Sequence, residues 1–407
     1  MNTMHAQQVE FDALWTSLAG IGRDRTSGGY RRFAWNAADL ELREWFADQA
    51  AHRGMAYQRD RNGNQWAWWG TPAPGAVVTG SHLDSVPDGG AFDGPLGVVS
   101  AFLAVDRLRA AGVQPERPVA VVNFTDEEGA RFGVACIGSK LLTGALDPDR
   151  ARALADQEGT TVAEAMRAAG ADPEALGRDD EALARIGTFV ELHVEQGRWL
   201  VDHGAPVGVA SAIWPHGRWR FGFRGEANHA GTTRLVDRHD PMLPFARTVL
   251  AARAAADDAG AVATIGRVRV LPNGTNAIPS LVEAWLDARA PDEETMSIVV
   301  DRIAAEARRA AAEHGVDVQT GRESSTPVVD FPSHLRDRIA ALLGGAPTLP
   351  SGAGHDAGIL AAEVPTAMLF VRNPTGVSHS PAEHAEAADC LAGVAALATV
   401  LEELACR

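Results

Sequence analysis

Three short apolar runs, each closed at its carboxyl end by His, Asp or Glu, constrain the fold of this chain most strongly. The runs 76–79, 119–124 and 188–193 lead into the segments GSHLDSV, FTDEEGARFG and ELHVEQG. Runs this apolar are typical of strands that are buried on both faces. Helical periodicity over 96–111 separates the first two runs. Strand, helix, strand predicts an α/β domain with helices on both faces of a mixed sheet.

A different pattern begins near residue 212. Over 218–224 the three aromatic side chains point to one side and the three arginines to the other, with Gly222 between Phe221 and Phe223, which predicts a half-buried strand with one open face. A helix near 243–256, strands near 263–271 and 281–289 and a helix over 292–314 follow. This order predicts a small antiparallel α+β unit of ferredoxin-like type. The α/β pattern returns after residue 327, with a strand over 366–371 and a final helix after Glu386.

The two patterns define the expected domains. We expect a discontinuous first domain over 1–211 and 327–407, and a second domain inserted into it over 212–326. The open strand face and sheet edge of the inserted domain need to be covered, and an edge from a second copy would do that. We therefore expect a homodimer.

Charge and composition exclude several classes of protein. The net charge is −16, from 37 basic and 53 acidic residues, and such a surface repels phosphate backbones, so we expect no nucleic-acid partner. No apolar stretch approaches the ~18 residues of a membrane span, and the first residues lack the basic and apolar segments of a signal peptide. The cysteines (Cys136, Cys390 and Cys406) are too few for a disulfide framework. We expect a cytoplasmic protein without membrane contact.

The residues that carry chemistry gather after the apolar runs, where open α/β sheets place their sites. Imidazole and carboxylate groups without thiolates suit Zn²⁺, Mn²⁺, Co²⁺ or Ni²⁺. The residues of these types at the strand ends are His82, Asp84, Asp93, Asp126, Glu127, Glu128, His193, Glu195, Gln196 and His379. Two histidines, two or three carboxylates and a further histidine are too many ligands for one ion and about right for two ions that share a bridging carboxylate.

The adjacent pair Glu127 and Glu128 is the most informative part of this set. Neighbouring side chains leave the backbone in different directions, so one can bind a metal while the other faces the substrate and accepts a proton from water. Asp84 lies two residues after His82 and is placed to accept the other ring N–H of that histidine, which would fix its tautomer.

Six segments then show a resemblance to a known family. GSHLDSVPDGGAFDGPLGV, FTDEEGARFG, ELHVEQG, GEANHAGTT, PNGTNAIP and GVSHSP occur in order over about 75–390 and resemble the hydantoinase/carbamoylase branch of the dinuclear-metal M20 amidohydrolases and peptidases. The resemblance implies two divalent ions per subunit, Zn²⁺ or Mn²⁺ with Co²⁺ or Ni²⁺ as alternatives. It also implies that the first domain is the catalytic, metal-binding domain and that the inserted domain is a lid or dimerisation domain. Residues of the inserted domain would lie over the active site, some of them from the partner subunit of a dimer.

Carried over to this sequence, the resemblance implies a role for each metal-site residue. His82, Asp93 and His193 would hold one ion, Asp93 would bridge, and Glu128 and His379 would hold the other. Glu127 would be the general base. His384 is a rival for His379, but His379 precedes Ser380 and Pro381 and so matches the HSP pattern of the family.

The resemblance also implies residues that contact the substrate. His229 would stabilise the oxyanion, Asn276 would hydrogen-bond the substrate, and Arg289 would bind its carboxylate in a bidentate fork. Simpler alternatives are a turn-capping His229, an Asn276 turn and an ion pair between Arg289 and Asp287. Further pocket candidates are Gln196, His355 and His216. His216 belongs to the segment IWPH, which replaces the Gly-Gln that the resemblance leads us to expect before Arg218. A second departure is TTRLVDRHDP, in which Arg234 replaces the usual Pro.

The expected activity is hydrolysis of a linear amide or ureido C–N bond in a small carboxylate, with release of ammonia and CO₂. Allantoate is the first expected substrate, because RFGVACIGSK and the stretch beginning SGGYRRFAW resemble allantoate amidohydrolases. The alternatives are N-carbamoyl-L-amino acids, N-formyl amino acids and, in the wider M20 group, dipeptides or peptides. A metal-binding protein without catalysis is disfavoured, because the base and the ligand set are intact.

Overall fold

The computed structural model describes residues 3–406 and divides the chain into two compact units. The first unit contains the chain up to Ser211 and from Asp330 onward, and the second contains Ala212–Val329. No helix among the described residues has the length and apolarity needed to cross a membrane.

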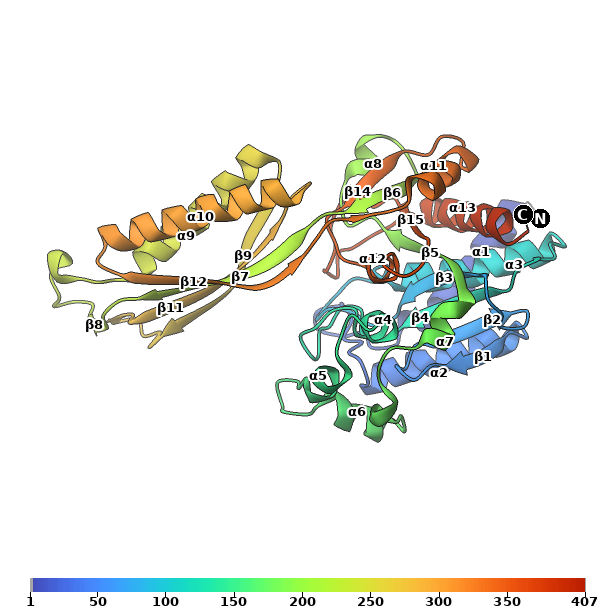
Figure 1. The fold of residues 1–407 in the computed structure, drawn as a ribbon, viewed down its shortest axis with the longest axis horizontal. Coiled ribbons are helices and arrows are strands. Elements are labelled where there is room, and N and C mark those ends of the chain that lie inside the picture. The colour runs from blue at the N-terminus through green and yellow to red at the C-terminus, as the bar shows by residue number, and fades with distance from the viewer. Residues whose placement is uncertain (1–2, 407) are drawn as a thin grey trace. The chain divides into compact units, whose positions relative to one another are not determined.

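The first unit is built on a nine-stranded mixed sheet (Figure 1). Its strands run in the order β1-β2-β4-β3-β5-β15-β6-β13, and β14 pairs with β6. The four central strands β4, β3, β5 and β15 are parallel, so their carboxyl ends lie at one edge. The strands are β1 (Ala56–Arg59), β2 (Gln65–Trp69), β3 (Ala76–His82), β4 (Val119–Phe124), β5 (Ile186–Val194), β6 (Val207–Ile213), β13 (Val329–Asp330), β14 (Thr348–Ser351) and β15 (Thr366–Val371).

Both faces of the central strands are buried, as their continuous apolar runs predict. Alternate residues such as Val190 and Leu192 join the main core, which α1, α2, α3 and α13 cover. The intervening residues, such as Phe189 and Met368, are also fully buried, on the side where α4, α7 and α12 lie. The helices are α1 (Thr3–Ala19), α2 (Ala37–His52), α3 (Pro95–Ala110), α4 (Ile137–Thr143), α5 (Pro148–Ala153), α6 (Val162–Ala168), α7 (Asp180–Arg185), α8 (Trp199–Asp202), α11 (Ser333–Leu342), α12 (Asp356–Leu360) and α13 (Ala387–Ala405), with a 3₁₀ turn η1 (Pro173–Ala175).

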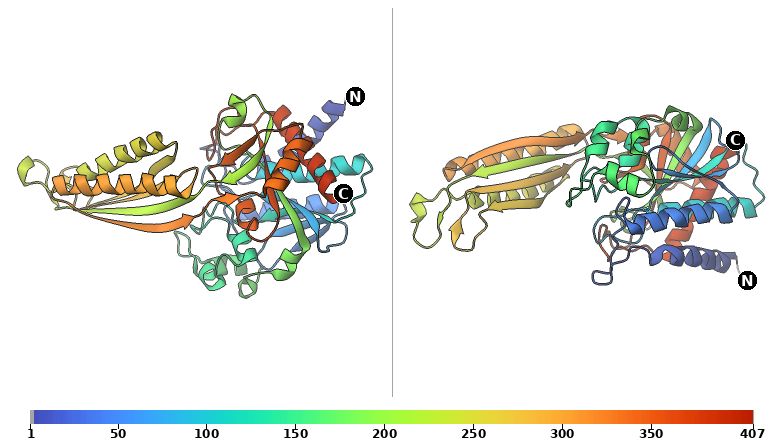
Figure 2. Two further views of the ribbon diagram at one scale, coloured as in Figure 1. Left: turned by 45° about the horizontal axis from the view of Figure 1, so that its top comes forward. Right: turned by 90° about the horizontal axis from the view of Figure 1, so that it is seen from below.

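The second unit has a four-stranded antiparallel sheet in the order β12-β7-β11-β9, with α9 and α10 over one face (Figure 2). The order of its main elements, β-α-β-β-α-β, is the ferredoxin-like arrangement. The elements are β7 (His216–Arg224), β8 (Asn228–His229), η2 (Leu235–Asp237), α9 (Met242–Ala259), β9 (Val262–Leu271), β10 (Ala277–Ile278), β11 (Leu281–Arg289), α10 (Glu293–Glu313) and β12 (Asp317–Thr326).

Local sequence explains why these elements form. The Asp292 side chain caps α10 by accepting a hydrogen bond from the Thr295 amide, and the buried positions Met296, Val299, Val300 and Ile303 repeat at helical spacing. On β7, Phe221 and Phe223 are buried, while the arginines on either side of this pair, Arg220 and Arg224, are exposed. The α/β class and the inserted α+β unit predicted from the sequence are confirmed; β12, which completes the second sheet, was not predicted.

Candidate metal centre

The candidate metal centre lies at the carboxyl edge of the central strands, entirely within the first unit. His82 ends β3, Glu127 and Glu128 follow β4, and His193 is the penultimate residue of β5. Parallel pairing places these strand ends side by side, with His82 opposite Phe124 and His193 opposite Phe370. The loops before α3 and after β15 supply the other members, Asp93 and His379.

Three groups of side chains are close enough to hold a metal ion. They are His82 with Asp93 and His193, Asp93 with Glu128 and His379, and His82 with Glu127 and Glu128, and within each group the ligand atoms lie within 4.8 Å of one another. Two of these groups share Asp93. Its Oδ1 atom lies 3.2 Å from His193 Nε2, whereas its Oδ2 atom lies 3.3 Å from His379 Nε2. One carboxylate therefore presents a separate oxygen to each group.

The tautomers of the two buried histidines are set by backbone carbonyl groups. His193 Nδ1 lies 2.9 Å from the carbonyl oxygen of Val194, and His82 Nδ1 lies 3.2 Å from that of Asp84. A carbonyl only accepts, so each Nδ1 carries the proton and each Nε2 directs a lone pair inward. Both Nε2 atoms and Glu128 Oε1 are buried without a hydrogen-bond partner in the described part of the chain. Unsatisfied buried polar atoms are rare, and these three belong to the groups of side chains that are close enough to hold a metal, so they fit bound cations.

The charge balance of the cluster also fits divalent cations. Four carboxylates meet there (Asp84, Asp93, Glu127 and Glu128), and among residues 3–406 no Lys or Arg forms an ion pair with them. Burial raises the pKa of Glu128 to about 7. Burial alone would lower the pKa of His82, but the surrounding carboxylates raise it well above its usual value. These raised pKa values mean that the buried carboxylates and histidines retain protons, and bound divalent ions would take the place of such protons.

Asp84 has a larger role than orienting His82. Its Oδ1 accepts the amide hydrogen of Glu127 at 3.1 Å, and its Oδ2 accepts that of Glu128 at 3.0 Å. The same Oδ1 lies 3.4 Å from His82 Nδ1. One carboxylate thereby fixes the positions of two neighbouring strand ends.

Glu127 is held on its other side by the start of α4. The Cys136 thiol donates to Glu127 Oε1 at 3.5 Å, and the Cys136 amide donates to the Glu127 carbonyl oxygen at 2.7 Å. Glu127 Oε2 lies 3.8 Å from His82 Nε2. Burial is the main cause that raises the pKa of Glu127 well above its usual value, and the neighbouring Glu128 charge adds to it.

Backbone conformation at the rim is unusual in three places. His379 and Asp126 have φ values of 54° and 55°, in the left-handed region that non-glycine residues seldom adopt. Gly94 has φ 84° and ψ −60°, and a Cβ atom there would lie 2.4–2.6 Å from ring atoms of His82. Only glycine lets the chain pass this close to the imidazole.

The other predicted residues of the first unit lie beside the cluster. Gln196 Nε2 donates to Asp93 Oδ2 at 2.9 Å and lies 3.3 Å from His379 Nε2. His355 is buried, with its ring centroid 4.6 Å from that of His193 and its Nε2 atom 3.2 Å from Ser351 Oγ. His384 is half exposed and pairs with Glu386, and it belongs to none of the three groups.

In the second unit, His229 and Asn276 are brought together. The short strands β8 and β10 pair, with His229 opposite Ala277, and the Ala230 amide donates to the Asn276 carbonyl oxygen. His229 Nδ1 accepts the amide hydrogens of Gly231 at 2.9 Å and Thr232 at 3.2 Å. A ring nitrogen that accepts carries no proton, so Nε2 bears the hydrogen and is a donor.

His216 and Arg289 are also neighbours, paired across β7 and β11. Arg289 Nε donates to Asp287 Oδ1 at 2.8 Å, which is the ion pair considered as the alternative to a substrate clamp. His216 Nδ1 lies 3.2 Å from the Trp214 carbonyl oxygen. Their contact with substrate stays a prediction.

Three further residues of the centre were not singled out in the sequence. Glu383 accepts hydrogen bonds from the Phe92 and Asp93 amides, Ser378 lies between Glu383 and Asp93, and Cys136 contacts Glu127. Ser378 and Glu383 flank the predicted ligand His379 in VSHSPAEH, so proximity in sequence was the available signal. Nothing in the local pattern distinguishes Cys136 from a core thiol.

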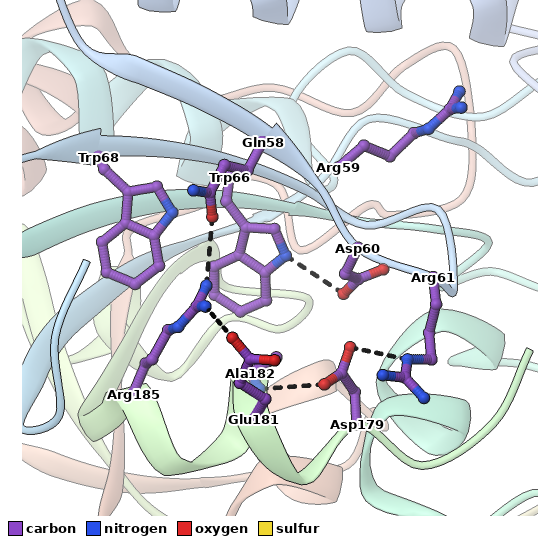
Figure 3. Close-up of a pocket in the computed structure, with 10 residues that line it drawn as sticks. All are labelled: Gln58, Arg59, Asp60, Arg61, Trp66, Trp68, Asp179, Glu181, Ala182 and Arg185. Carbon is purple, nitrogen blue, oxygen red and sulfur yellow. Dashed lines mark hydrogen bonds and ion pairs between the residues drawn. The ribbon is translucent and has the colours of Figure 1, made fainter. Parts of the chain in front are cut away.

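A separate pocket of the first unit, with a cavity of about 240 Å³, lies against β1, β2 and α7 (Figure 3). Most of its charged side chains pair with one another: Arg61 with Asp179, and Arg185 with Glu181. Trp66 donates to Asp60. None of the metal-centre residues lines this pocket, so the chemistry of the site does not extend to it.

Comparison with known proteins places this site in a family. The sequence profile of Peptidase family M20/M25/M40 matches residues 78–403. An N-carbamoyl-L-amino acid amidohydrolase of Geobacillus stearothermophilus is 38% identical, with 98% of this chain and 99% of the relative covered. An allantoate amidohydrolase of Escherichia coli is 34% identical, with 100% and 99% covered. The crystal structure of a hydantoinase/carbamoylase family amidase from Burkholderia vietnamiensis matches with a TM-score of 0.87 and 30% identity, covering 98% of both chains.

The α/β sheet with its inserted α+β unit and its His and carboxylate cluster defines a metal-dependent hydrolase. The chain belongs to Peptidase family M20/M25/M40, and within it to the hydantoinase/carbamoylase amidohydrolases. It is therefore a hydrolytic enzyme that acts on amide or ureido bonds, with a site for divalent metal.

Proposed function

We propose that this enzyme hydrolyses the terminal ureido or carbamoyl C–N bond of a small carboxylate, using two divalent ions, Zn²⁺ or Mn²⁺, per subunit. His82, His193 and Asp93 would hold one ion, and Asp93, Glu128 and His379 the other. The observation that carries this proposal is the shared Asp93, whose two oxygens face different histidines. The unpaired Nε2 atoms of His82 and His193 support it.

Glu127 is the proton carrier in this proposal. Divalent ions in such a site lower the pKa of water and polarise the substrate carbonyl. Glu127 takes the proton of the attacking water and returns it to the departing nitrogen, and its raised pKa suits a group that must do both. The bond to the terminal nitrogen breaks, ammonia leaves, and the remaining carbamate decomposes to CO₂ and the amine.

Two residues of the second unit would complete the site. His229 has a free Nε2–H donor because its Nδ1 accepts two backbone hydrogens, and this donor suits a developing oxyanion. Arg289 would hold the substrate carboxylate, exchanging its pairing with Asp287 for a bidentate contact. Asn276, His216, Gln196 and His355 are further proposed pocket residues.

Allantoate is our first substrate, on the resemblance of two sequence segments. One of them, RFGVACIGSK, contains Cys136 beside Glu127 and so belongs to the centre. In the other, Tyr30 and Arg32 are buried, and Arg32 donates to the Ile21 and Leu18 carbonyl oxygens. That segment therefore supports the fold and bears less directly on substrate choice.

N-carbamoyl-L-amino acids are the second candidate. The relative that hydrolyses them is 38% identical, against 34% for the allantoate amidohydrolase. Both substrates present a terminal ureido group and a carboxylate, so the proposed centre accommodates either. The two substrates differ in the chemical group that links the ureido group to the carboxylate.

We propose that the enzyme is a homodimer formed through the second unit, and that it works in the cytoplasm. Leu250 on α9 is 72% exposed, and Leu235 and Val236 near His229 are 81% and 84% exposed. Apolar side chains this exposed are typical of interaction surfaces. The three cysteines are free, as in a reducing compartment. Sedimentation tests the dimer: a monomer with full activity would contradict a role for His229 from the partner subunit.

Ammonia release tests the proposed reaction. Metal-stripped protein is reconstituted with Mn²⁺ and assayed with allantoate, N-carbamoyl-L-amino acids, N-formyl amino acids and dipeptides, the last two by release of the free amine. Rapid turnover of allantoate alone supports the first candidate, and turnover of the carbamoyl compounds alone supports the second. Turnover of dipeptides alone contradicts the proposal.

A further inference from the structure

The loop that carries Asp93 is anchored to a distant part of the chain. Both the Phe92 and the Asp93 amides donate to a single oxygen, Glu383 Oε2, each at 2.9 Å. Glu383 lies in the segment that follows His379, 290 residues from Asp93 in the sequence. This carboxylate thus joins the two loops that hold Asp93 and His379.

The second oxygen of Glu383 is also engaged. Ser378 Oγ donates to Glu383 Oε1 at 2.9 Å and lies 3.2 Å from Asp93 Oδ2. Gln196 Nε2 donates to Asp93 Oδ2 and lies 3.3 Å from Ser378 Oγ. The backbone and the side chain of Asp93 are therefore held by one connected set of hydrogen bonds, in which Glu383 accepts from the two amides and from Ser378.

The Glu383 side chain is buried and packs closely against the loop that carries Asp93. Glu383 is 5% exposed, and no Lys or Arg of the described chain pairs with it. A Cβ atom on Gly90 would lie 2.3–2.5 Å from atoms of the Glu383 side chain. Burying a carboxylate without a cationic partner is costly unless several donors compensate it, and three donors do so here.

We propose that Glu383 is a positioning residue for the metal centre, which acts by fixing the backbone of Asp93 and thereby the direction of its two oxygens. This inference rests on the proposed role of Asp93 as the shared ligand. Outer hydrogen-bond partners of metal ligands typically contribute about 10–100-fold to metal affinity. The mechanism requires hydrogen-bond acceptors at the right distance and does not require the negative charge.

Three substitutions separate position from charge. Glu383→Gln removes the charge but keeps an oxygen for the two amides and an NH₂ that donates to Ser378. Glu383→Asp keeps the charge but withdraws it by one methylene. Glu383→Ala removes both. Glu386→Gln is the matched control, because Glu386 is an exposed carboxylate three residues away whose one ion pair among residues 3–406 is with His384.

The readout is the affinity of each metal-free variant for Mn²⁺, with free ion followed by electron paramagnetic resonance and folding by circular dichroism. We expect Glu383→Ala and Glu383→Asp to lose about 10–100-fold in affinity. Glu383→Gln and Glu386→Gln should stay close to the unaltered chain. If Glu383→Ala does not fold, the Gln and Asp variants still decide.

Two results overturn the inference. One is a Glu383→Asp variant that binds Mn²⁺ as tightly as the unaltered chain; the other is a Glu383→Gln variant that loses as much affinity as Glu383→Asp. An unaltered chain that binds no Mn²⁺ is a different outcome, because it refutes the metal centre itself. The titration needs no substrate, so it is independent of the proposed reaction.

Discussion

The contact between Gly94 and His82 gives a sharp test of the centre. Gly94→Ala adds a Cβ atom that would lie 2.4–2.6 Å from His82 ring atoms. The ring cannot simply turn aside, because its Nδ1 is held by the Asp84 carbonyl oxygen and its Nε2 faces Asp93. The substitution must therefore displace either the loop before α3 or the imidazole.

The expected cost has two parts. Forcing an atom into a packed site costs about 1–3 kcal/mol, and placing alanine in the sparsely populated backbone region of Gly94 costs about another 1–3 kcal/mol. Gly112→Ala is the matched control, because Gly112 also has a positive φ, 75°, but no atom of the described residues lies within 4 Å of its added Cβ. It should incur only the backbone cost.

The assay is the urea midpoint of metal-free protein, followed by the Mn²⁺ affinity of each folded variant. Gly94→Ala should unfold at clearly lower urea than Gly112→Ala and should also bind Mn²⁺ more weakly. The reasoning is refuted if the two variants share a midpoint, or if Gly94→Ala binds Mn²⁺ like the unaltered chain.

Four other results are expected. Glu127→Gln should lower kcat by about 10²–10⁴-fold with unchanged metal content, because the proton acceptor is lost while the ligands remain; retained kcat would exclude Glu127 as the base. Asp84→Asn should weaken Mn²⁺ binding about 10–100-fold, because an amide NH₂ would face one of the two backbone N–H groups that Asp84 now accepts. Chelation should lower the melting temperature and added Mn²⁺ restore it, since the ions would bind only the folded state; no shift would contradict the centre. Burial raises the pKa of the Cys390 thiol from 9.0 to about 12. Between these pH values the thiol keeps its proton in the folded state and loses it on unfolding, so the free energy of unfolding decreases as pH rises. This decrease should be smaller in Cys390→Ala.

The elements that the sequence predicted are those with a strong apolar period. Burial on both faces requires continuous apolar runs in β3, β4, β5 and β15, and burial on one face requires alternation in β7. Both patterns can be seen in the sequence. β12 carries no such period, because DVQTGRESST is exposed along most of its length. Its place is set by pairing with β7, from Asp317 opposite Arg224 to Thr326 opposite His216. A strand held mainly by its backbone leaves little trace in side-chain pattern.

The candidate ligands were predictable for a similar reason, and their supports were not. His82, Glu128 and His193 follow buried strands, where chain direction alone brings them together. Glu383 lies in PAEH, which resembles an ordinary surface loop. Its Oε2 atom accepts hydrogen bonds from the Phe92 and Asp93 amides, which are 291 and 290 residues away in the sequence. Asp84 was expected to orient His82, but its two contacts with the Glu127 and Glu128 amides depend on how neighbouring strands end.

The way the second unit joins the chain has a consequence for evolution. The chain leaves the main sheet along β6 and returns along β13, and these strands are neighbours in that sheet. Within the inserted unit, the first and last strands of the four-stranded sheet, β7 and β12, are neighbours too. The two ends of the insertion therefore lie on neighbouring strands of the main sheet. Gaining, losing or exchanging the whole unit would change the first unit only at the connection between β6 and β13. A lineage can therefore replace this unit, and with it the residues near His229, without rebuilding the sheet that carries the metal centre.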